Sequence, residues 1–532
     1  MNTIPFFDCN CMVGRRAFRE PNTLYRAEDF IRELDYHNIS AALAYHAMAK
    51  ELYQPYGNER LLADIGSSPR LVPCWVVIPH HLGEMPRPKT LVAEMRRQNV
   101  RAARLFPKLH GFELADEFAG ELLTELEREA ITVFMDAAET DFPTLFKLCQ
   151  THPKLPIVLC GVSWGSDRRL YPLLEACANV HVETASYQGH NSLDKICQRF
   201  GAERLLFGTG LPFMSPGPAK AMVLYSSISP EDKRKIASGN LLRLLGLTSL
   251  PSANPPQMDS IMATMERGEP VTCVEVLDAH AHIGHAGWRG IHQCSLHEQD
   301  AAAMVASMDT AGIRMAMISA WAGITSDEKA GNELVAQAVR DYPGRFIGYA
   351  SFNPSYPEDL DAEMKRCFEQ FGMKGFKPYP PRHQYPLDGA NNKKVLEYCN
   401  AHHLPILCHY GGNPTGSVTA AQVEKLSEQY LHAKFMFGHS GSSWEAARQT
   451  AAVAKKRHNV FMEITYTSVT FGAIEYMAKE AGADKVIFGS DFPMRDPHPQ
   501  LAWVAYAKLS FEDKRKILGE NFKAILADVR PV

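Results

Sequence analysis

Short runs of apolar residues alternate with amphipathic stretches along the chain. In the C-terminal half, the runs begin near Val274, Ile313, Phe346, Met373, Leu404, Lys434, Asn459 and Lys485. The stretch from Asn332 to Asp341 is typical of the segments between them, because its apolar residues recur with the period of a helix. Eight strands that alternate with helices predict a (β/α)8 barrel, a fold of about 250 residues. A doubly wound open sheet is the alternative, but no glycine-rich phosphate loop follows a first strand.

The N-terminal half repeats this pattern with related residues. Residues 229–246 read SPEDKRKIASGNLLRLLG, and residues 510–526 read SFEDKRKILGENFKAIL. They are preceded by LLFGTGLPF at 205–213 and by VIFGSDFPM at 486–494, with the same separation along the chain. Earlier segments also correspond, and their separation shortens slightly toward the N-terminus, as a few short insertions would cause. The chain therefore contains one unit twice, which predicts an α/β protein of two tandem (β/α)8 TIM-like barrels.

The segment between the two copies has the composition of a linker. Residues 247–257 read LTSLPSANPPQ, and their proline and serine content disfavours a packed helix or strand. We therefore assign residues 1–248 to a first barrel, 249–270 to a linker and 271–532 to a second barrel.

The composition is that of a soluble globular protein, with 45% hydrophobic and 22% charged residues. The formal net charge of -4 offers no basis for binding nucleic acid or an anionic membrane. No apolar stretch reaches the roughly 18 residues of a membrane-spanning helix, and the first residues lack the pattern of a signal peptide. The 12 cysteines are scattered without a CxxC pair, which favours reduced thiols and a cytoplasmic protein.

Several apolar runs of the second copy end in a histidine or an aspartate. The first run ends in Asp278-Ala-His280-Ala-His282, and both histidines share one face because strand side chains alternate. The fifth, sixth and eighth runs end in His409, His439 and Asp491. Active sites of such barrels lie at the C-terminal ends of the strands, so we expect these side chains to cluster. Three histidines and a carboxylate can hold a divalent metal and leave a position for water or substrate.

The order DxHxH, strand-end His, strand-end GHxG and FGSDxP resembles the amidohydrolase superfamily. More narrowly, it resembles the amidohydrolase-2 branch of metal-dependent hydrolases and non-oxidative decarboxylases, over essentially all of the second copy. The resemblance implies one metal ion, with His280, His282, His409 and Asp491 as its ligands. It also implies two catalytic residues, Asp491 as a proton carrier and His439 beside the metal-bound water, where its imidazole can stabilise charge on the substrate.

Other residues near the strand ends are candidates for substrate binding. Lys377 ends the fourth run and can contact a substrate carboxylate, whereas Lys374 lies on the opposite strand face. Some amidohydrolases carboxylate a strand-four lysine to bridge two metals, but this branch generally lacks that bridge, so we expect a single metal. Rim-loop residues that could contact the substrate are Trp288, Arg289, Tyr379 and Arg495.

The same metal centre is compatible with more than one reaction. We expect Zn²⁺ by default, and Mn²⁺, Fe²⁺ or Co²⁺ would fit the same ligands. Hydrolysis of an ester, lactone or amide by metal-activated water is the leading prediction. Decarboxylation of a small, for example aromatic, carboxylic acid is the alternative, and a non-catalytic binding or sensor protein is the third. The expected partner is a small-molecule substrate, not nucleic acid or a membrane. We also expect the two barrels to pack on each other, and further oligomerisation is left open.

The first copy differs at the positions that carry chemistry in the second. His280, His282, His409, His439 and Asp491 correspond to Asn10, Met12, Asp136, Gly161 and Gly210. Methionine is a poor ligand for such an ion and glycine has no side chain, so these residues cannot form the site. Asp8 is retained, and Arg104 aligns with Lys377, which leaves an anion-binding remnant as one hypothesis. We predict a degenerate, non-catalytic first barrel that stabilises or completes the second.

Overall fold

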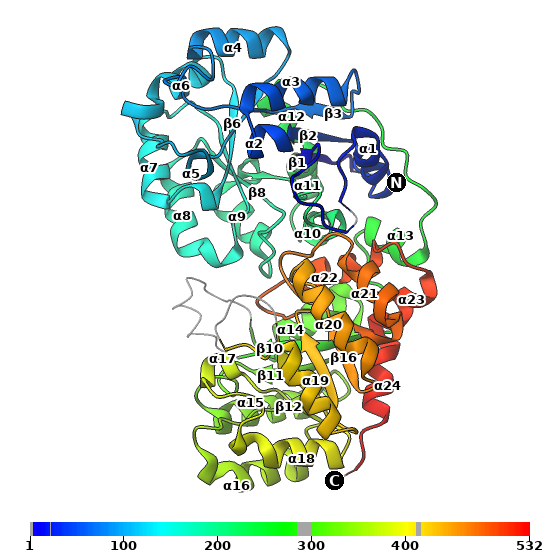
Figure 1. Cartoon of the computed structure of the whole chain (residues 1–532). Helices are drawn as coiled ribbons and strands as arrows, with labels where there is room; N and C mark the ends of the chain where they lie inside the picture. The colour runs from blue at the N-terminus through cyan, green and yellow to red at the C-terminus, as the bar shows by residue number, and fades with distance from the viewer. Residues whose placement is uncertain (1–3, 22, 285–298, 411–415, 532) are drawn as a thin grey trace. The chain divides into compact units, whose positions relative to one another are not determined.

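The computed structural model describes residues 4–21, 23–284, 299–410 and 416–531 (Figure 1). The chain forms two compact units, Met1–Met258 and Asp259–Val532, and their boundary lies within the segment assigned as the linker. Residues 247–259 contain no helix or strand, whereas helix α13 (Ser260–Glu266) belongs to the second unit. Within the described ranges, no helix combines the length and the apolar character that crossing a bilayer requires.

The second unit contains an eight-stranded parallel sheet in which each strand pairs with the next along the chain. Its strands are β10 (Val276–Ile283), β11 (Ile313–Ala320), β12 (Phe346–Ala350), β13 (Gly375–Phe376), β14 (Pro405–His409), β15 (Lys434–Gly438), β16 (Val460–Glu463) and β17 (Val486–Ile487). The chain beyond β17 returns to β10, where the N–H of His282 donates to the carbonyl of Phe492 at 2.7 Å. A barrel results, and each predicted apolar run corresponds to one of its strands.

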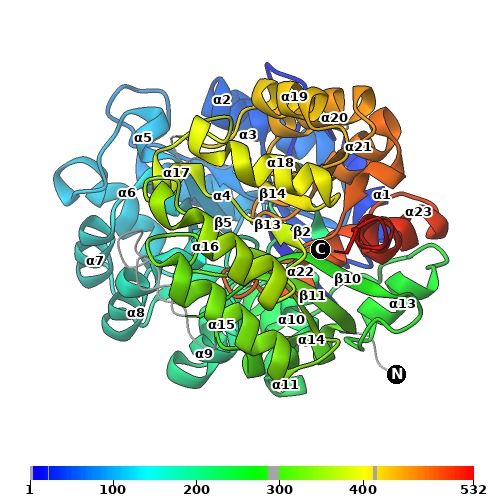
Figure 2. The same ribbon diagram turned by 90° about the horizontal axis from the view of Figure 1, so that it is seen from below.

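Helices lie around these strands, as Figure 2 shows. They are α14 (Ala301–Ala311), α15 (Glu328–Asp341), α16 (Leu360–Met364), α17 (Pro380–His383), α18 (Lys393–Ala401), α19 (Ala420–Gln429), α20 (Trp444–Lys456), α21 (Ala473–Ala481), α22 (Pro497–Ala505), α23 (Phe511–Arg515) and α24 (Asn521–Ala527). Polar residues start several of them: Asp300 accepts from the N–H of Ala303, and Ser443 accepts from that of Ala446. Inside the barrel, Leu277, Met317 and Leu407 are buried in one apolar cluster below the strand ends.

The first unit has the same architecture with one interrupted strand. Its strands are β1 (Phe7–Val13), β2 (Ala41–His46), β3 (Leu71–Pro73), β4 (Trp75–Val76), β5 (Ala102–Leu105), β6 (Thr132–Asp136), β7 (Ile157–Cys160), β8 (Val180–Glu183) and β9 (Leu205–Leu206). β3 and β4 together take the third position, because Cys74 between them donates its N–H to Ala44. The barrel closes where the N–H of Cys9 donates to the carbonyl of Phe207.

The helices of the first unit follow its strands in the same alternation. They are α1 (Ala27–Tyr36), α2 (Ala47–Glu51), α3 (Gln54–Ile65), α4 (Pro88–Arg97), α5 (Pro107–His110), α6 (Asp116–Arg128), α7 (Phe142–Thr151), α8 (Asp167–Ala176), α9 (Ser192–Phe200), α10 (Pro216–Tyr225), α11 (Pro230–Arg234) and α12 (Asn240–Leu245). The repeated segment forms the same structure in both units, with a π-helical turn at Lys235–Gly239 and at Lys516–Glu520. The two units are therefore both TIM-like barrels, as the sequence predicts.

Candidate metal centre

The polar side chains at the strand ends of the second barrel are buried together. His280 and His282 lie on β10, His409 is the last residue of β14, and His439 directly follows β15. Asp491 lies in the loop after β17. All five side chains are buried, so the cluster lies inside the fold rather than on an open surface.

Three of the four predicted ligands converge on one point. The Oδ1 atom of Asp491 lies 3.2 Å from Nε2 of His282 and 3.7 Å from Nε2 of His280. One ligand atom from each of the three residues lies within 4.8 Å of the others. Two imidazoles and a carboxylate that converge in this way are a donor set for a first-row divalent metal.

His409, the fourth predicted ligand, lies at the edge of this cluster. Its ring packs against His439 and against Tyr379, with 4.8 Å between ring centroids in each case. Among the described residues it joins no group of converging ligand atoms. The structure therefore places His409 beside the centre, and its role as a ligand stays a prediction.

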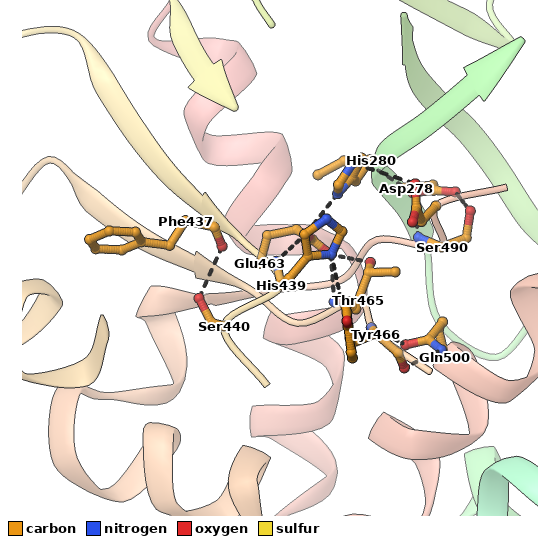
Figure 3. Close-up of polar contacts among 12 residues, drawn as sticks. Asp278, His280, Phe437, His439, Ser440, Glu463, Thr465, Tyr466, Ser490 and Gln500 are labelled. Atoms are coloured by element: carbon orange, nitrogen blue, oxygen red, sulfur yellow. Dashed lines mark hydrogen bonds and ion pairs between the residues drawn. The ribbon is translucent and has the colours of Figure 1, made fainter. Parts of the chain in front are cut away.

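Hydrogen bonds fix which nitrogen of His280 carries the proton. Nδ1 lies 2.8 Å from Oε2 of Glu463, and Nε2 lies 3.2 Å from Nζ of Lys377 (Figure 3 shows the His280–Glu463 side). Burial and the Lys377 charge hold the pKa of His280 well below its usual range, so the ring is neutral. With Nδ1 directed at a carboxylate acceptor, Nε2 is the acceptor nitrogen of the ring, and in this structure its lone pair faces the Lys377 amine near Asp491.

The second histidine of the pair is held in a comparable way. Nδ1 of His282 lies 2.9 Å from the hydroxyl of Ser319, and its ring lies 4.2 Å from the ring of Trp321 between centroids. Its Nε2 atom therefore points toward Asp491. Both histidines of the DxHxH motif thus present Nε2 to the same point and use Nδ1 to hold their orientation.

Asp491 is kept charged by a neighbouring arginine. Burial alone would raise its pKa, but the Arg495 guanidinium and the two histidines hold the pKa of Asp491 well below its usual range. Arg495 contacts Oδ2 of Asp491, donates from Nε to the Thr467 hydroxyl at 2.8 Å, and lies over the Tyr466 ring. Arg495, predicted as a rim-loop residue that could contact the substrate, is buried and bound to Asp491, and its substrate contact stays a prediction.

His439 is neutral and oriented by the backbone. Its Nδ1 donates to the carbonyl of Thr465 at 2.7 Å, which leaves Nε2 as an acceptor. Burial, with the neighbouring His280, lowers the pKa of His439 to about 3. The ring centroid lies 5.0 Å from that of His280, so His439 faces the centre without being one of the three converging groups around Asp491. This position suits a group that handles a proton on a bound molecule.

Lys377 is a second buried cation of the site, beside Arg495. It directly follows β13, its side chain is 1% exposed, and burial lowers its pKa to about 8. Lys374, by contrast, is exposed, as the alternation of strand faces predicts. Tyr379 is buried against His409, whereas Trp288 and Arg289 lie outside the described residues.

Two buried carboxylates support the cluster, and sequence reasoning assigned a role to neither. Asp278 accepts the N–H groups of His280 and Ser490, both at 3.0 Å, and burial raises its pKa to about 7. Glu463, at the end of β16, contacts His280 and accepts the N–H of His439 at 3.2 Å. Glu463 matches Glu183 of the first barrel, which lacks the histidines of the site. Its position at the end of a strand is the sequence feature that indicates a role at the site.

The first barrel has an arginine where the second has its converging ligands. The guanidinium of Arg104 donates to Oδ1 of Asn10 at 3.0 Å and contacts the carboxylate of Asp136. These two residues correspond to His280 and His409. Among the described residues of this unit, no group of histidine, cysteine or acidic side chains converges as a metal site would require. Arg104 is thus paired within the protein.

Comparison with known proteins identifies the family. A model of the amidohydrolase family matches residues 58–247 and 277–526, more than half of the chain and parts of both barrels. Gamma-resorcylate decarboxylase of Polaromonas sp. (strain JS666) is 24% identical over 234 residues, which are 35% of this chain and 72% of that protein.

Solved structures resemble one half of the chain. A TIM-barrel protein from Bordetella bronchiseptica is 17% identical with a TM-score of 0.41, over 48% of this chain and 99% of that one. 5-Carboxyvanillate decarboxylase from Sphingomonas paucimobilis is 16% identical with a TM-score of 0.39, over 48% and 99%. A dihydroxybenzoic acid decarboxylase from Polaromonas sp. JS666, solved with manganese and 2-nitroresorcinol, is 17% identical with a TM-score of 0.39, over 48% and 97%. On the match of the family model, the chain belongs to the amidohydrolase family of enzymes.

Proposed function

We propose that the second barrel is a metal-dependent, non-oxidative decarboxylase of a small aromatic acid. The observation that carries this proposal is the buried amine of Lys377, 3.2 Å from the His280 nitrogen that faces the metal-binding point. A substrate carboxylate bound beside the metal would lie against the Lys377 cation in a buried site. The relative from Polaromonas sp. is named as a decarboxylase, which favours this reaction over hydrolysis.

His280, His282 and Asp491 would hold the metal, with His409 as the fourth ligand. A bound divalent ion would supply a Lewis acid that polarises oxygen atoms of the substrate. The donor set fits such an ion, because two imidazoles and one carboxylate converge and each is held by a further hydrogen bond. Nitrogen and oxygen donors of this kind accept Zn²⁺, Mn²⁺, Fe²⁺ or Co²⁺, so the ion is a matter for experiment.

Each side chain of the site would then have a separate role in the reaction. A proton is added to the ring carbon that bears the carboxylate, the bond between them breaks, its electron pair returns to the ring, and carbon dioxide leaves. Lys377 would hold the carboxylate until the bond breaks. Asp491, fixed by Arg495, and His439, with its free Nε2, are the groups placed to carry the proton.

Hydrolysis is the second candidate, and one observation favours it. Nε2 of His439 is left as an acceptor beside the centre, so it could take a proton from water as well as handle one on an acid. A lactone or ester would then be opened by the activated water.

The experiment that separates these reactions uses the full chain. The protein is stripped with a chelator, reloaded with each candidate ion, and supplied with dihydroxybenzoates, related phenolic acids, lactones and esters. Carbon dioxide released with a single organic product supports decarboxylation, whereas a ring-opened or cleaved product without carbon dioxide supports hydrolysis. Asp491→Asn and His280→Ala should abolish turnover and metal binding. If both variants keep their metal and bind the same ligands, the metal-centre proposal is wrong.

A further inference from the structure

We propose that Glu463 is a positioning residue of the metal centre, which holds the imidazole of His280 and the backbone of His439 in a fixed relation. This inference rests on the proposed function only in that His280 binds the metal. Glu463 does not belong to the group of ligand atoms that converges around Asp491, and its contacts are with His280 and His439, so it would act through the two histidines.

Both oxygens of the Glu463 carboxylate are occupied. Oε2 lies 2.8 Å from Nδ1 of His280 and accepts the N–H of His439 at 3.2 Å (Figure 3). Oε1 accepts the N–H of Thr465 at 2.7 Å and also contacts its hydroxyl. The side chain has no exposed surface. With all these hydrogen bonds the carboxylate has one available orientation. Its contacts in turn fix the His280 ring and the His439 backbone.

The contacts of the two ring nitrogens of His280 define its tautomer. Lysine has only hydrogens to offer, so the contact of Lys377 with Nε2 marks that nitrogen as an acceptor. The proton of the neutral ring is therefore on Nδ1 and is donated to Glu463. A metal needs the Nε2 lone pair, so Glu463 selects the tautomer that can bind it.

Glu463 and His280 pack closely against the backbone of Gly489. A Cβ atom added at Gly489 would lie 2.5 Å from Oε1 of Glu463 and 2.8 Å from Cβ of His280. Gly489 belongs to the FGSD segment that leads to Asp491. The glycine is therefore required so that the backbone before Asp491, the Glu463 carboxylate and the His280 side chain can pack together.

The first barrel contains the same carboxylate without the histidine. Glu183 is also fully buried and accepts the N–H groups of Gly161 at 3.1 Å and Ala185 at 2.6 Å, at the positions of His439 and Thr465. Its barrel has Asn10 where His280 stands, and Asn10 bonds Arg104 instead. The bonds to backbone groups are thus common to both barrels, and the bond to an imidazole belongs to the second alone.

This pair supplies a matched test in the full-length protein. Glu463→Gln and Glu183→Gln both keep the shape of the side chain but replace one acceptor oxygen by a donor. We expect both to lower the melting temperature of the metal-free protein. Only Glu463→Gln should weaken Mn²⁺ binding, measured by titration calorimetry, by about 10- to 100-fold. Mn²⁺ affinity equal to that of the parent in Glu463→Gln, or an equal loss in Glu183→Gln, would overturn the proposal.

A milder variant covers the case in which Glu463→Gln does not fold. Thr465→Ala removes one hydroxyl contact to Glu463, and the first barrel tolerates alanine at this position as Ala185. It should fold and weaken Mn²⁺ binding by a few-fold, and unchanged affinity would count against the role of Glu463. A parent that binds Mn²⁺ through His280 but decarboxylates nothing would refute the proposed reaction alone. A parent that binds no divalent ion would refute both proposals.

Discussion

The two barrels adopt the same backbone conformation at two positions where their side chains differ completely. In the second barrel His439 has φ +70° and Asp491 has φ +56°, values that residues with a Cβ rarely adopt. The corresponding residues of the first barrel are Gly161 at φ +66° and Gly210 at φ +74°. Such conformations cost about 1–3 kcal/mol for a non-glycine residue and are concentrated at functional sites. The second barrel therefore tolerates backbone strain at these two positions to place two chemical groups, and the first barrel has neither the strain nor the groups there.

The barrels also differ in the side chains that lie inside them at the carboxyl ends of the strands. The second gathers two imidazoles and a carboxylate that each direct one ligand atom at the same point. The first places Arg104, a cation of its own chain, between Asn10 and Asp136. An internal cation makes a metal unnecessary for that cluster. Where the first barrel lacks the ligands, Arg104 therefore supplies hydrogen-bond donors to the polar side chains that remain, Asn10 and Asp136.

Beneath these differences lie carboxylates that the barrels share. Asp8 accepts the N–H groups of Asn10 and Thr209 in the way that Asp278 accepts those of His280 and Ser490. Each ties the first strand to the chain beyond the last one, which closes the barrel. Asp8 and Asp278 therefore have a structural role in both barrels, whereas the histidines and Asp491 are the groups proposed to bind the metal.

The largest effect is expected when a residue of the first barrel is moved into the second. Asp491→Gly should reduce turnover by about 10²- to 10⁴-fold or more, because it removes both a proton carrier and a metal ligand. The fold should survive, since the first barrel has Gly210 at this position and the same backbone conformation. Turnover, metal content and the thermal melting curve check this. An unfolded variant would show that Asp491 also holds the barrel together, and the comparison would fail.

The next effect concerns a buried cation of the second barrel. Lys377→Met should raise KM by about 10- to 100-fold, because it removes a charged partner of the substrate carboxylate. The pKa of Lys377 is about 8, lowered by burial, so substrate binding should weaken as the pH rises through that value. A pH profile of kcat/KM measures this, and Lys377→Arg should move the decline to higher pH. A profile that is the same in the parent and in Lys377→Met would exclude the role.

Stability should respond to the same group in the opposite direction. The folded-state pKa of Lys377 lies below that of a free lysine, so the unfolded chain binds the proton more readily. The metal-free parent should therefore gain stability as the pH rises from about 8 toward about 10.4, and Lys377→Met should lack this gain. Urea unfolding at several pH values provides the measurement.

The repeat and the strand-end pattern were enough to predict the fold and most of the centre. Each expected run became a strand, and His280, His282 and Asp491 converged as their positions after apolar runs indicated. What could not be predicted depends on distances across the barrel and on the folding of a loop. The bond from Glu463 to His280 joins the first strand to the seventh. The contact of Arg495 with Asp491 is local, and it depends on how the loop after β17 folds. Neither contact has a sequence pattern of its own.

A smaller effect is expected from removing the cation of the first barrel. Arg104→Met should lower the free energy of unfolding by about 1–3 kcal/mol, because Asn10 and Asp136 lose a charged donor. Since the Asp136 side chain is 30% exposed, water should replace part of the lost interaction. Asp136→Leu in the same chain should recover some stability. Turnover and Mn²⁺ affinity should stay at the level of the parent, and a loss of either would show that the first barrel takes part in the chemistry.

The smallest effect isolates the backbone strain itself. Gly161 has φ +66°, and a Cβ built there meets no atom within 4 Å, so Gly161→Ala adds the cost of the conformation without a clash. We expect a loss of about 1 kcal/mol in the free energy of unfolding. Gly239, at φ -59° with its nearest backbone contact at 3.5 Å, is the matched control, where alanine should be neutral or stabilising. If Gly161→Ala is as harmless as Gly239→Ala, the left-handed position bears no cost, and strain at His439 and Asp491 does not explain why the first barrel has glycine there.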